Sequence, residues 1–419
     1  MASTSNNIIT LRRHDLDNLK TFLTGLVVVH HTAIFYGGEG SWLRSRLIPR
    51  DHVLWPLLIF NGFNQSFFMG LFFWISGRMS AQALNKEDTS LATFLKAKVV
   101  RLLVPTVANT LLGPPLVTCL AQGRIEGSIF QDYWGRVRGV RGVTWYTATL
   151  FAFDGVAALL HQCLPSSNHS GKERRKNSDP IYDVLKKYGW ILAATASFLI
   201  RLDHPVGRTS TPFGVQPAYL AQYILAYTLG HLSLKHGDTR MAGLFEHASP
   251  SRSDEPTSLK PGTTTAKRSP SLPMAVTISV LTAPVCFLAS EESTSWSGGW
   301  NLNAVAYAVW NELSFMLIGP ALMDHFQIYQ GKAATSSLWQ AKFSYAVYLI
   351  HAPLSVAIEA AVDKGLVGIS GVVRIMEHPV GLMLGSMALT GVIGYVNTAA
   401  SFATGKLLLE VFPSLARVL

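Results

Sequence analysis

Two side chains near the start of the chain could do acid–base chemistry inside a membrane. Lys20 and His31 stand in the segment LDNLKTFLTGLVVVHH. At about 100° and 1.5 Å per residue, a helix brings both side chains to within about 20° of one face and about 16 Å apart along the axis. A neutral imidazole at such a depth can take the proton of a hydroxyl group. The spacing therefore predicts a helix with a cation at its mouth and a general base, His31, near its middle.

Two neighbours of this pair lie away from the stripe, which is the helix face that Lys20 and His31 share. Asp17 is about 40° from the direction of His31, so we expect it to join the stripe loosely. His30 is about 80° away, and we expect it to hydrogen-bond a neighbouring helix rather than to react. For His31 itself, such a structural hydrogen bond is the alternative to catalysis.

A second polar cluster lies in KFSYAVYLIHAPL, residues 342–354. Ser344, Tyr348 and His351 follow one another at i, i+4 and i+7, which is one helix face, and Tyr345 is one residue off it. A polar stripe on an apolar helix must face protein or a water-filled cavity. The cluster predicts either part of a binding site or a set of hydrogen bonds between helices.

Three further charges stand in or beside apolar segments. Glu312 and Asp154 are single acids inside such segments, and each requires a partner there. Arg101 stands at the start of an apolar segment, in a basic stretch. That position suits an anionic cytosolic ligand and equally suits anionic lipid.

The elements that hold these residues must be membrane helices. The chain has 419 residues, of which 49% are hydrophobic and only 14% charged, against roughly 25% charged in ordinary soluble domains. A spanning helix needs about 20 mostly apolar residues. About ten segments qualify, and they lie at 21–38, 53–77, 102–123, 143–164, 188–200, 212–232, 271–290, 301–322, 343–362 and 379–405. The predicted fold is an all-α, polytopic membrane bundle formed by a single domain, residues 1–419.

The distribution of basic residues predicts the orientation. With ten spans and the N-terminus in the cytoplasm, roughly two thirds of the 35 Lys and Arg residues fall on the cytoplasmic side. Both termini are therefore expected there, with two polar cytoplasmic loops at 165–187 and 247–273. The net charge of +10 serves as this topology signal, so it does not require a nucleic-acid partner.

Several catalytic patterns are absent from the sequence. It contains no G-x-S-x-G, H-E-x-x-H, Walker A or dinucleotide-binding pattern, and no His followed five positions later by Asp. Its three cysteines, at 119, 163 and 286, form no zinc or disulfide pattern. We therefore expect no bound metal and no resident cofactor.

The motifs together resemble one family. LDNLKTFLTGLVVVHH, FFMGLFFWISG, the RLLVP that begins at Arg101, TWYTATLFAF, SYAVYLIHAP and the tail VFPSLARVL run in order along nearly the whole chain. They resemble the acyltransferase 3 family of multi-pass membrane O-acyltransferases, in a fungal-type form. The chain departs from the family pattern at Lys20, where Arg is commoner, and at Arg78, where an aromatic residue is usual.

The resemblance implies about ten helices and acyl transfer, with acetyl the expected group, from cytosolic acyl-CoA as co-substrate to a hydroxyl of a small molecule. It implies that His31 is the base or a proton shuttle, that Lys20 holds the donor phosphates or orients the site, and that Arg101 contributes to phosphate binding. Asp17, Glu312, Tyr348 and the trio Ser344, Tyr345 and His351 are expected to line the donor or acceptor site.

The acceptor and the compartment follow from weaker signals. The cytosolic loops and the altered second-span motif resemble fungal members of the family. This resemblance implies a small secondary metabolite as acceptor, with the endoplasmic reticulum as location in a eukaryote and the plasma membrane otherwise. A multi-pass transporter is the alternative, because interrupted spans with intramembrane charges also fit a carrier. A membrane cyclase or isomerase that acts through Asp154 and Glu312 is a third hypothesis.

Overall fold

The fold is known from a computed structural model. It describes residues 12–40, 43–49, 52–86, 90–163, 179–241, 243–244, 270–287 and 295–417. Within these ranges the chain is helical, and the one extended pairing is an isolated bridge between Ser210 and Val215. The predicted all-α class is confirmed.

Each of the ten apolar segments contains a helix. In chain order these are α1 (His14–Phe35), α2 (Trp55–Leu84), α3 (Leu91–Lys98) with α4 (Val104–Gln122), α6 (Trp145–Cys163), α7 (Pro180–Arg201), α8 (Leu220–Lys235), α9 (Leu272–Phe287), α10 (Leu302–Tyr329), α11 (Ala341–Val367) and α13 (Pro379–Val411). A π-helical turn, Val99–Leu103, joins α3 to α4. Two short helices, α5 (Gly127–Arg136) and α12 (Ser370–Glu377), lie in connections.

Six described helical stretches are long and apolar enough to cross a membrane. They are Trp55–Leu84, Leu91–Gln122, Gly142–Cys163, Leu302–Tyr329, Ala341–Val367 and Pro379–Val411. The helix Leu272–Phe287 is apolar but shorter. The total of ten spans and the cytoplasmic position of both termini stay predictions.

Two helix starts differ from the expectation. The helix α7 begins at Pro180 rather than near 188, because Asp179 caps it by accepting from the Ile181 N–H at 3.2 Å and proline suits the first helical position. Residues 180–187 of the predicted loop are therefore helical. The helix α8 begins at Leu220 rather than 212, since two prolines and a glycine occupy 212–217. The predicted loop 247–273 lies outside the described residues as far as 269.

The helices α2 and α8 pack with their backbones in close approach. A Cβ atom on Gly77 would lie 2.2 Å from the carbonyl oxygen of Tyr227, and one on Gly230 would lie 2.0 Å from that of Trp74. Small residues let two backbones approach in this way. In a membrane, where the hydrophobic effect does not drive helices together, the close packing that results stabilises their association. The last glycine of the FFMGLFFWISG motif, Gly77, therefore lies where α2 crosses α8.

Prolines within the helices free carbonyls, and neighbouring side chains bind them. The Tyr133 hydroxyl donates to the carbonyl four residues before Pro114 at 2.7 Å, and the Trp134 indole donates to the one four residues before Pro115 at 2.9 Å. Proline has no N–H for the residue four positions earlier. The prolines of α4 thereby hold α5 in place.

Hydrogen bonds to carbonyls freed by proline also link α4 to α11. The Asn109 amide donates at 3.0 Å to the carbonyl of Leu349, four residues before Pro353. The Tyr345 hydroxyl donates at 2.5 Å to the carbonyl of Arg101, four residues before Pro105. Two of the sequence motifs, RLLVP and SYAVYLIHAP, are therefore bound to each other.

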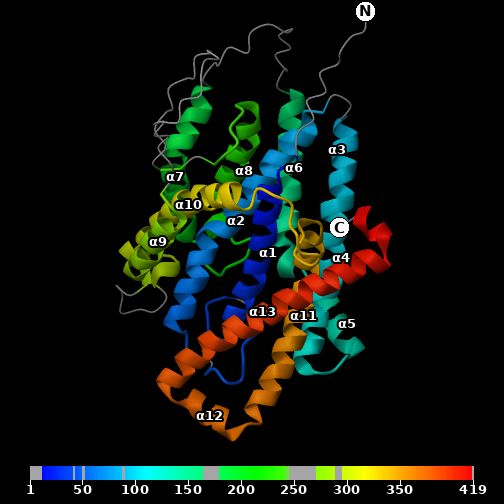
Figure 1. Ribbon diagram of the computed structural model, residues 1–419, viewed down its shortest axis with the longest axis vertical. Helices are drawn as coiled ribbons and strands as arrows, with labels where there is room; N and C mark the ends of the chain where they lie inside the picture. Colours follow the sequence, from blue (N-terminus) through cyan, green and yellow to red (C-terminus); the bar gives the residue numbers. More distant parts are fainter. Residues whose placement is uncertain are drawn as a thin grey trace, which may run out of the picture.

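The ends of several helices meet at one end of the bundle. The Arg13 guanidinium donates to the Thr239 carbonyl at 3.4 Å, and Lys235 lies 3.4 Å from Asp179. The start of α1, the start of α7 and the chain just after α8 therefore lie together. Figure 1 shows α12 at the opposite end and α13 crossing the bundle obliquely.

Candidate active site

A cavity of about 430 Å³ opens inside the bundle between α1, α2, α8, α10 and α11. Its inner wall includes His30, His31, Tyr348 and His351. Its rim comes from the loops after α1, before α6 and between α7 and α8, all at the end away from the start of α1. The volume lies within the range of small-molecule sites.

Two histidines from distant parts of the sequence meet in this cavity. The rings of His31 on α1 and His351 on α11 stack nearly parallel, with centroids 5.2 Å apart and planes at 7°. His351 is fully buried. The two strongest sequence clusters therefore form one site.

A backbone carbonyl fixes the proton position of His351. Its Nδ1 lies 2.7 Å from the carbonyl oxygen of Tyr348, one turn earlier on α11. A carbonyl only accepts, so Nδ1 carries the proton and Nε2 of the neutral ring is a lone-pair acceptor. Within the described chain this buried Nε2 has no hydrogen-bond partner. The cavity thus contains a neutral nitrogen base of defined tautomer.

His30 does more than the sequence predicted. It bonds a neighbouring helix as expected, since the Asn61 amide nitrogen on α2 lies 3.2 Å from its Nδ1 and 3.1 Å from its carbonyl oxygen. It also lines the cavity beside His31, with ring centroids 5.8 Å apart. Helix geometry placed His30 about 80° off the reactive stripe, but a cavity wall spans a wider arc than one stripe.

Aromatic side chains form most of the outer wall. They include Trp145, Tyr219, Tyr223, Phe287, Trp296 and Tyr307. The hydroxyls of Tyr219 and Tyr307 are 2.9 Å apart, and the buried guanidinium of Arg201 packs against both rings, 5.4 and 4.7 Å from the centroids. These residues come from several helices and share no sequence motif, so no pattern in the sequence predicts that they meet.

Two charged residues belong to the rim, Glu39 and Arg141. Desolvation raises the pKa of the Glu39 carboxyl above its usual value, and the charge of Arg44 partly opposes that rise. The cavity mouth is therefore polar, although its walls are aromatic.

The predicted cation of α1 does not reach the cavity. The ammonium of Lys20 lies 2.9 Å from the Asp17 carboxylate, which the Arg12 guanidinium also contacts at 2.8 Å. Burial raises the pKa of Asp17, but the hydrogen bonds and charges of Lys20 and Arg12 outweigh it, so the pKa lies below its usual value. Lys20 and Asp17 form an ion pair at the mouth of the helix.

The other residues predicted to bind the acyl donor lie at the same level of the bundle as Lys20. The hydroxyls of Thr21 and Ser344 are 3.5 Å apart, and Tyr345 is bonded to the backbone of Arg101. The guanidinium of Arg101 is on the exposed surface. Ser344 and Tyr345 thus lie about one and a half to two turns of α11 before His351 and outside the cavity lining.

The two single acids lie elsewhere. Glu312 is fully buried, and its Oε1 accepts from Asn311 at 3.0 Å and from Gln222 at 3.4 Å. Asp154, also fully buried, lies 2.7 Å from the Lys98 ammonium and 2.7 Å from the Tyr227 hydroxyl. Neither acid lines the cavity, so the geometry gives no support to a cyclase that uses both.

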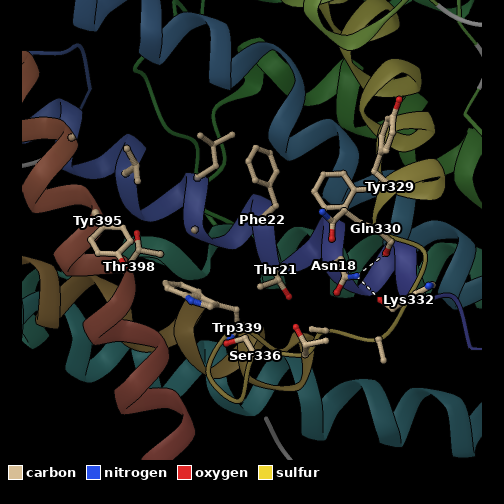
Figure 2. A pocket seen from close by; sticks show the side chains of 18 residues that line it. Asn18, Thr21, Phe22, Tyr329, Gln330, Lys332, Ser336, Trp339, Tyr395 and Thr398 are labelled. Atoms are coloured by element: carbon tan, nitrogen blue, oxygen red, sulfur yellow. Dashed lines mark hydrogen bonds between the residues drawn. The ribbon is translucent and has the colours of Figure 1, made fainter.

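A second hollow, about 660 Å³, lies on another face of α1 (Figure 2). Phe22, Trp339 and Tyr395 form its apolar part, and the Asn18 amide fixes its polar end by donating to the carbonyls of Gln330 and Lys332 at 2.7 and 2.9 Å. It shares no lining residue with the histidine cavity. The described residues that line it include no histidine, cysteine or acidic side chain.

No group of three or more metal-ligating side chains occurs among the described residues. The described lining of the cavity offers imidazoles, hydroxyls and amides, with one carboxylate and one guanidinium at the rim. Such groups suit proton transfer and hydrogen bonding to a carbonyl oxygen.

The chain is thus a helical bundle with helices long enough to cross a membrane, and two histidines from distant segments meet in its internal cavity. These features are those of a multi-pass membrane enzyme. A family model described as an acyltransferase domain matches residues 13–396. The chain belongs to this family, acyltransferase 3, and is a membrane acyltransferase. Comparisons with curated proteins and with solved structures give no match.

Proposed function

We propose that the protein transfers an acyl group, acetyl in the first instance, from acyl-CoA to a hydroxyl of a small molecule. The observation that carries the proposal is the stacked pair of His31 and His351 in an internal cavity of an acyltransferase-family chain. The donor arrives from the end where Lys20 and Arg101 lie, and these two cations contact its phosphates. The acceptor enters through the rim beside Glu39 and Arg141.

In the proposed reaction His31 accepts the proton of the acceptor hydroxyl. The hydroxyl oxygen attacks the thioester carbonyl carbon, and a tetrahedral intermediate forms. The intermediate collapses, the C–S bond breaks, and the sulfur leaves with the proton that His31 returns, as the free thiol. His351 stays neutral and stabilises the imidazolium of His31 through its ring face.

The distances along the helices suit a donor site at one end of the bundle and a reaction centre deeper inside it. Lys20 is about 16 Å from His31 along α1, and Ser344 is about 10 Å from His351 along α11. An extended pantetheine arm that starts at the cationic mouth would run along this path toward the two rings. We propose that Asp17 orients Lys20 and that Ser344, Tyr345 and Tyr348 line this path or support it. We propose that Glu312 acts outside the cavity, in the support of α8 against α10.

The cavity walls support the choice of acceptor. Aromatic faces bind flat or apolar rings, and within the described lining the charged side chains, Glu39 and Arg141, lie at the rim. We propose a hydroxylated secondary metabolite with an apolar ring system, and a location in the endoplasmic reticulum in a eukaryote or the plasma membrane otherwise.

Release of CoA thiol by the purified protein tests the proposal. The protein in detergent receives acetyl-CoA or longer acyl-CoAs together with pooled cell extract as the source of acceptors. We expect thiol release that requires extract and a product heavier by one acyl group. His31→Ala should abolish both. His161→Ala, an exposed histidine outside the cavity, is the matched control and should keep both.

The assay also decides between the hypotheses. Normal turnover by His31→Ala would remove His31 from the mechanism. Folded wild-type protein that releases no thiol with any donor, but moves an extract component across a vesicle membrane, would favour the transporter. A product of unchanged mass would favour an isomerase.

A further inference from the structure

We propose that His30 is a catalytic hydrogen-bond donor to the thioester carbonyl oxygen and that Asn61 is the positioning residue that makes it a donor. The inference rests on the proposed acyl transfer and adds a function for a residue that the mechanism above does not use. It starts from the two contacts between Asn61 and His30.

The first step is the orientation of the Asn61 amide. Its nitrogen lies 3.1 Å from the carbonyl oxygen of His30, and that oxygen can only accept. The amide nitrogen, not the amide oxygen, must therefore face His30. Asn61 is buried and lies on α2, so the contact joins two helices.

The second step is the tautomer of His30. The same amide nitrogen lies 3.2 Å from the ring Nδ1, and because it donates, Nδ1 accepts. In a neutral imidazole the other nitrogen then carries the proton. The Nε2–H of His30 is therefore a donor, whereas the Nε2 of His351 is an acceptor.

The third step is the direction of that donor. The Nδ1 edge of His30 is turned to Asn61, and the ring packs on Phe68 with centroids 5.0 Å apart. His30 lines the cavity beside His31, and we infer that the edge that carries Nε2, opposite the edge bonded to Asn61, faces it. One wall thus contains a base and a fixed donor on successive residues of α1.

This pairing suits the tetrahedral intermediate. When the acceptor oxygen attacks the thioester carbon, negative charge develops on the carbonyl oxygen. A preorganised N–H in a water-poor site stabilises that charge more than it stabilises the ground state. His30 transfers no proton in this role, and its hydrogen bond shortens as the charge grows.

Four variants test the proposal in the thiol-release assay. His30→Ala should lower kcat about 10²–10³-fold with little change in KM, as loss of one such donor does. His30→Gln keeps an N–H near the Nε2 position and should recover most of the loss. Asn61→Ala should lower kcat less than His30→Ala does, because the ring loses its anchor but keeps its N–H.

Asn61→Asp keeps the size of the side chain but replaces its donor by an acceptor, so the hydrogen bond to the His30 carbonyl is lost as well. Its ionised carboxylate accepts from Nδ1, so a neutral His30 ring carries its proton on Nδ1 and no longer donates through Nε2. Thermal unfolding of the variant in detergent measures the structural loss separately. We expect kcat as low as in His30→Ala at neutral pH and higher at acidic pH, where the carboxyl is protonated and donates. Asn64→Ala, a buried asparagine on α2 outside the cavity, is the control and should keep wild-type kcat.

The outcomes are separable. Wild-type thiol release with equal kcat in His30→Ala overturns the assignment and leaves the proposed function intact. A loss in His30→Ala that His30→Gln does not recover, with Asn61→Asp active at neutral pH, also overturns it. Wild-type protein that releases no thiol overturns the proposed function and this assignment together.

Discussion

His351 shows how one hydrogen bond determines what a side chain can do. Its Nδ1 proton is held by the carbonyl of Tyr348, so the ring presents a lone pair and stacks on His31. Two chemical roles are open to such a ring. It can support the imidazolium of His31 through its face, or it can itself take the proton through Nε2.

Substitution of His351 separates these roles. His351→Phe keeps a flat ring against His31 but has no nitrogen, whereas His351→Ala removes the ring. If His351 acts through its face, we expect His351→Phe to keep about a tenth of wild-type kcat or more and His351→Ala only about a thirtieth, since a ring–cation contact without water contributes about 2 kcal/mol. Equal and complete loss in both variants would instead make Nε2 the base. Thiol release and the thermal stability of each variant in detergent provide the measurement.

The residue scale is also where the sequence was most informative. An ionisable group in an apolar segment is costly and so tends to be functional, and this rule singles out His31 and His351. That rule could not separate them from Glu312 and Asp154, which obey it too. The difference lies in the partners: Asp154 is paired with Lys98 and Glu312 with two amides, and a single sequence does not say which charges meet.

At the scale of elements, helix positions follow from the sequence better than helix contacts do. Apolar length predicted all ten segments, but the start of α7 depended on the cap at Asp179 inside a polar stretch. The contacts of α4 with α11 could not be predicted. They depend on which side chain reaches the carbonyl that each proline frees, and the two partners are far apart in the sequence.

The bond between Asn109 and Leu349 gives a prediction at this scale. Pro353 has no N–H for the carbonyl of Leu349, and the Asn109 amide donates to it instead. Asn109→Ala removes this donor, and we expect the free energy of unfolding to fall by about 1 kcal/mol. Pro353→Ala restores an N–H to that carbonyl. In the Pro353→Ala background, Asn109→Ala should therefore cost clearly less. Thermal unfolding of the four proteins in detergent measures the coupling, and additive effects would show that the bond does not replace the missing helical one.

At the scale of the whole molecule, the two ends of the bundle differ. The cations of the proposed donor site lie at the end where α1 starts, and the rim of loops lies at the other. Cys163 ends α6, and its side chain is exposed, while Cys119 and Cys286 are buried. Thr209 is exposed at the cavity rim, in the loop between α7 and α8. These two positions mark the opposite ends of the bundle.

Cysteine labelling tests whether these ends lie on opposite sides of the membrane. In sealed vesicles with the cytoplasmic face outward, an impermeant maleimide should label Cys163 of the wild-type protein directly. Thr209→Cys in a Cys163→Ser background should react only after the vesicles are permeabilised, and Cys163→Ser alone should not react. Direct labelling at both positions would place the rim and the donor end on one side. The acceptor would then have to come from the cytoplasm, and transfer across the bilayer would be ruled out.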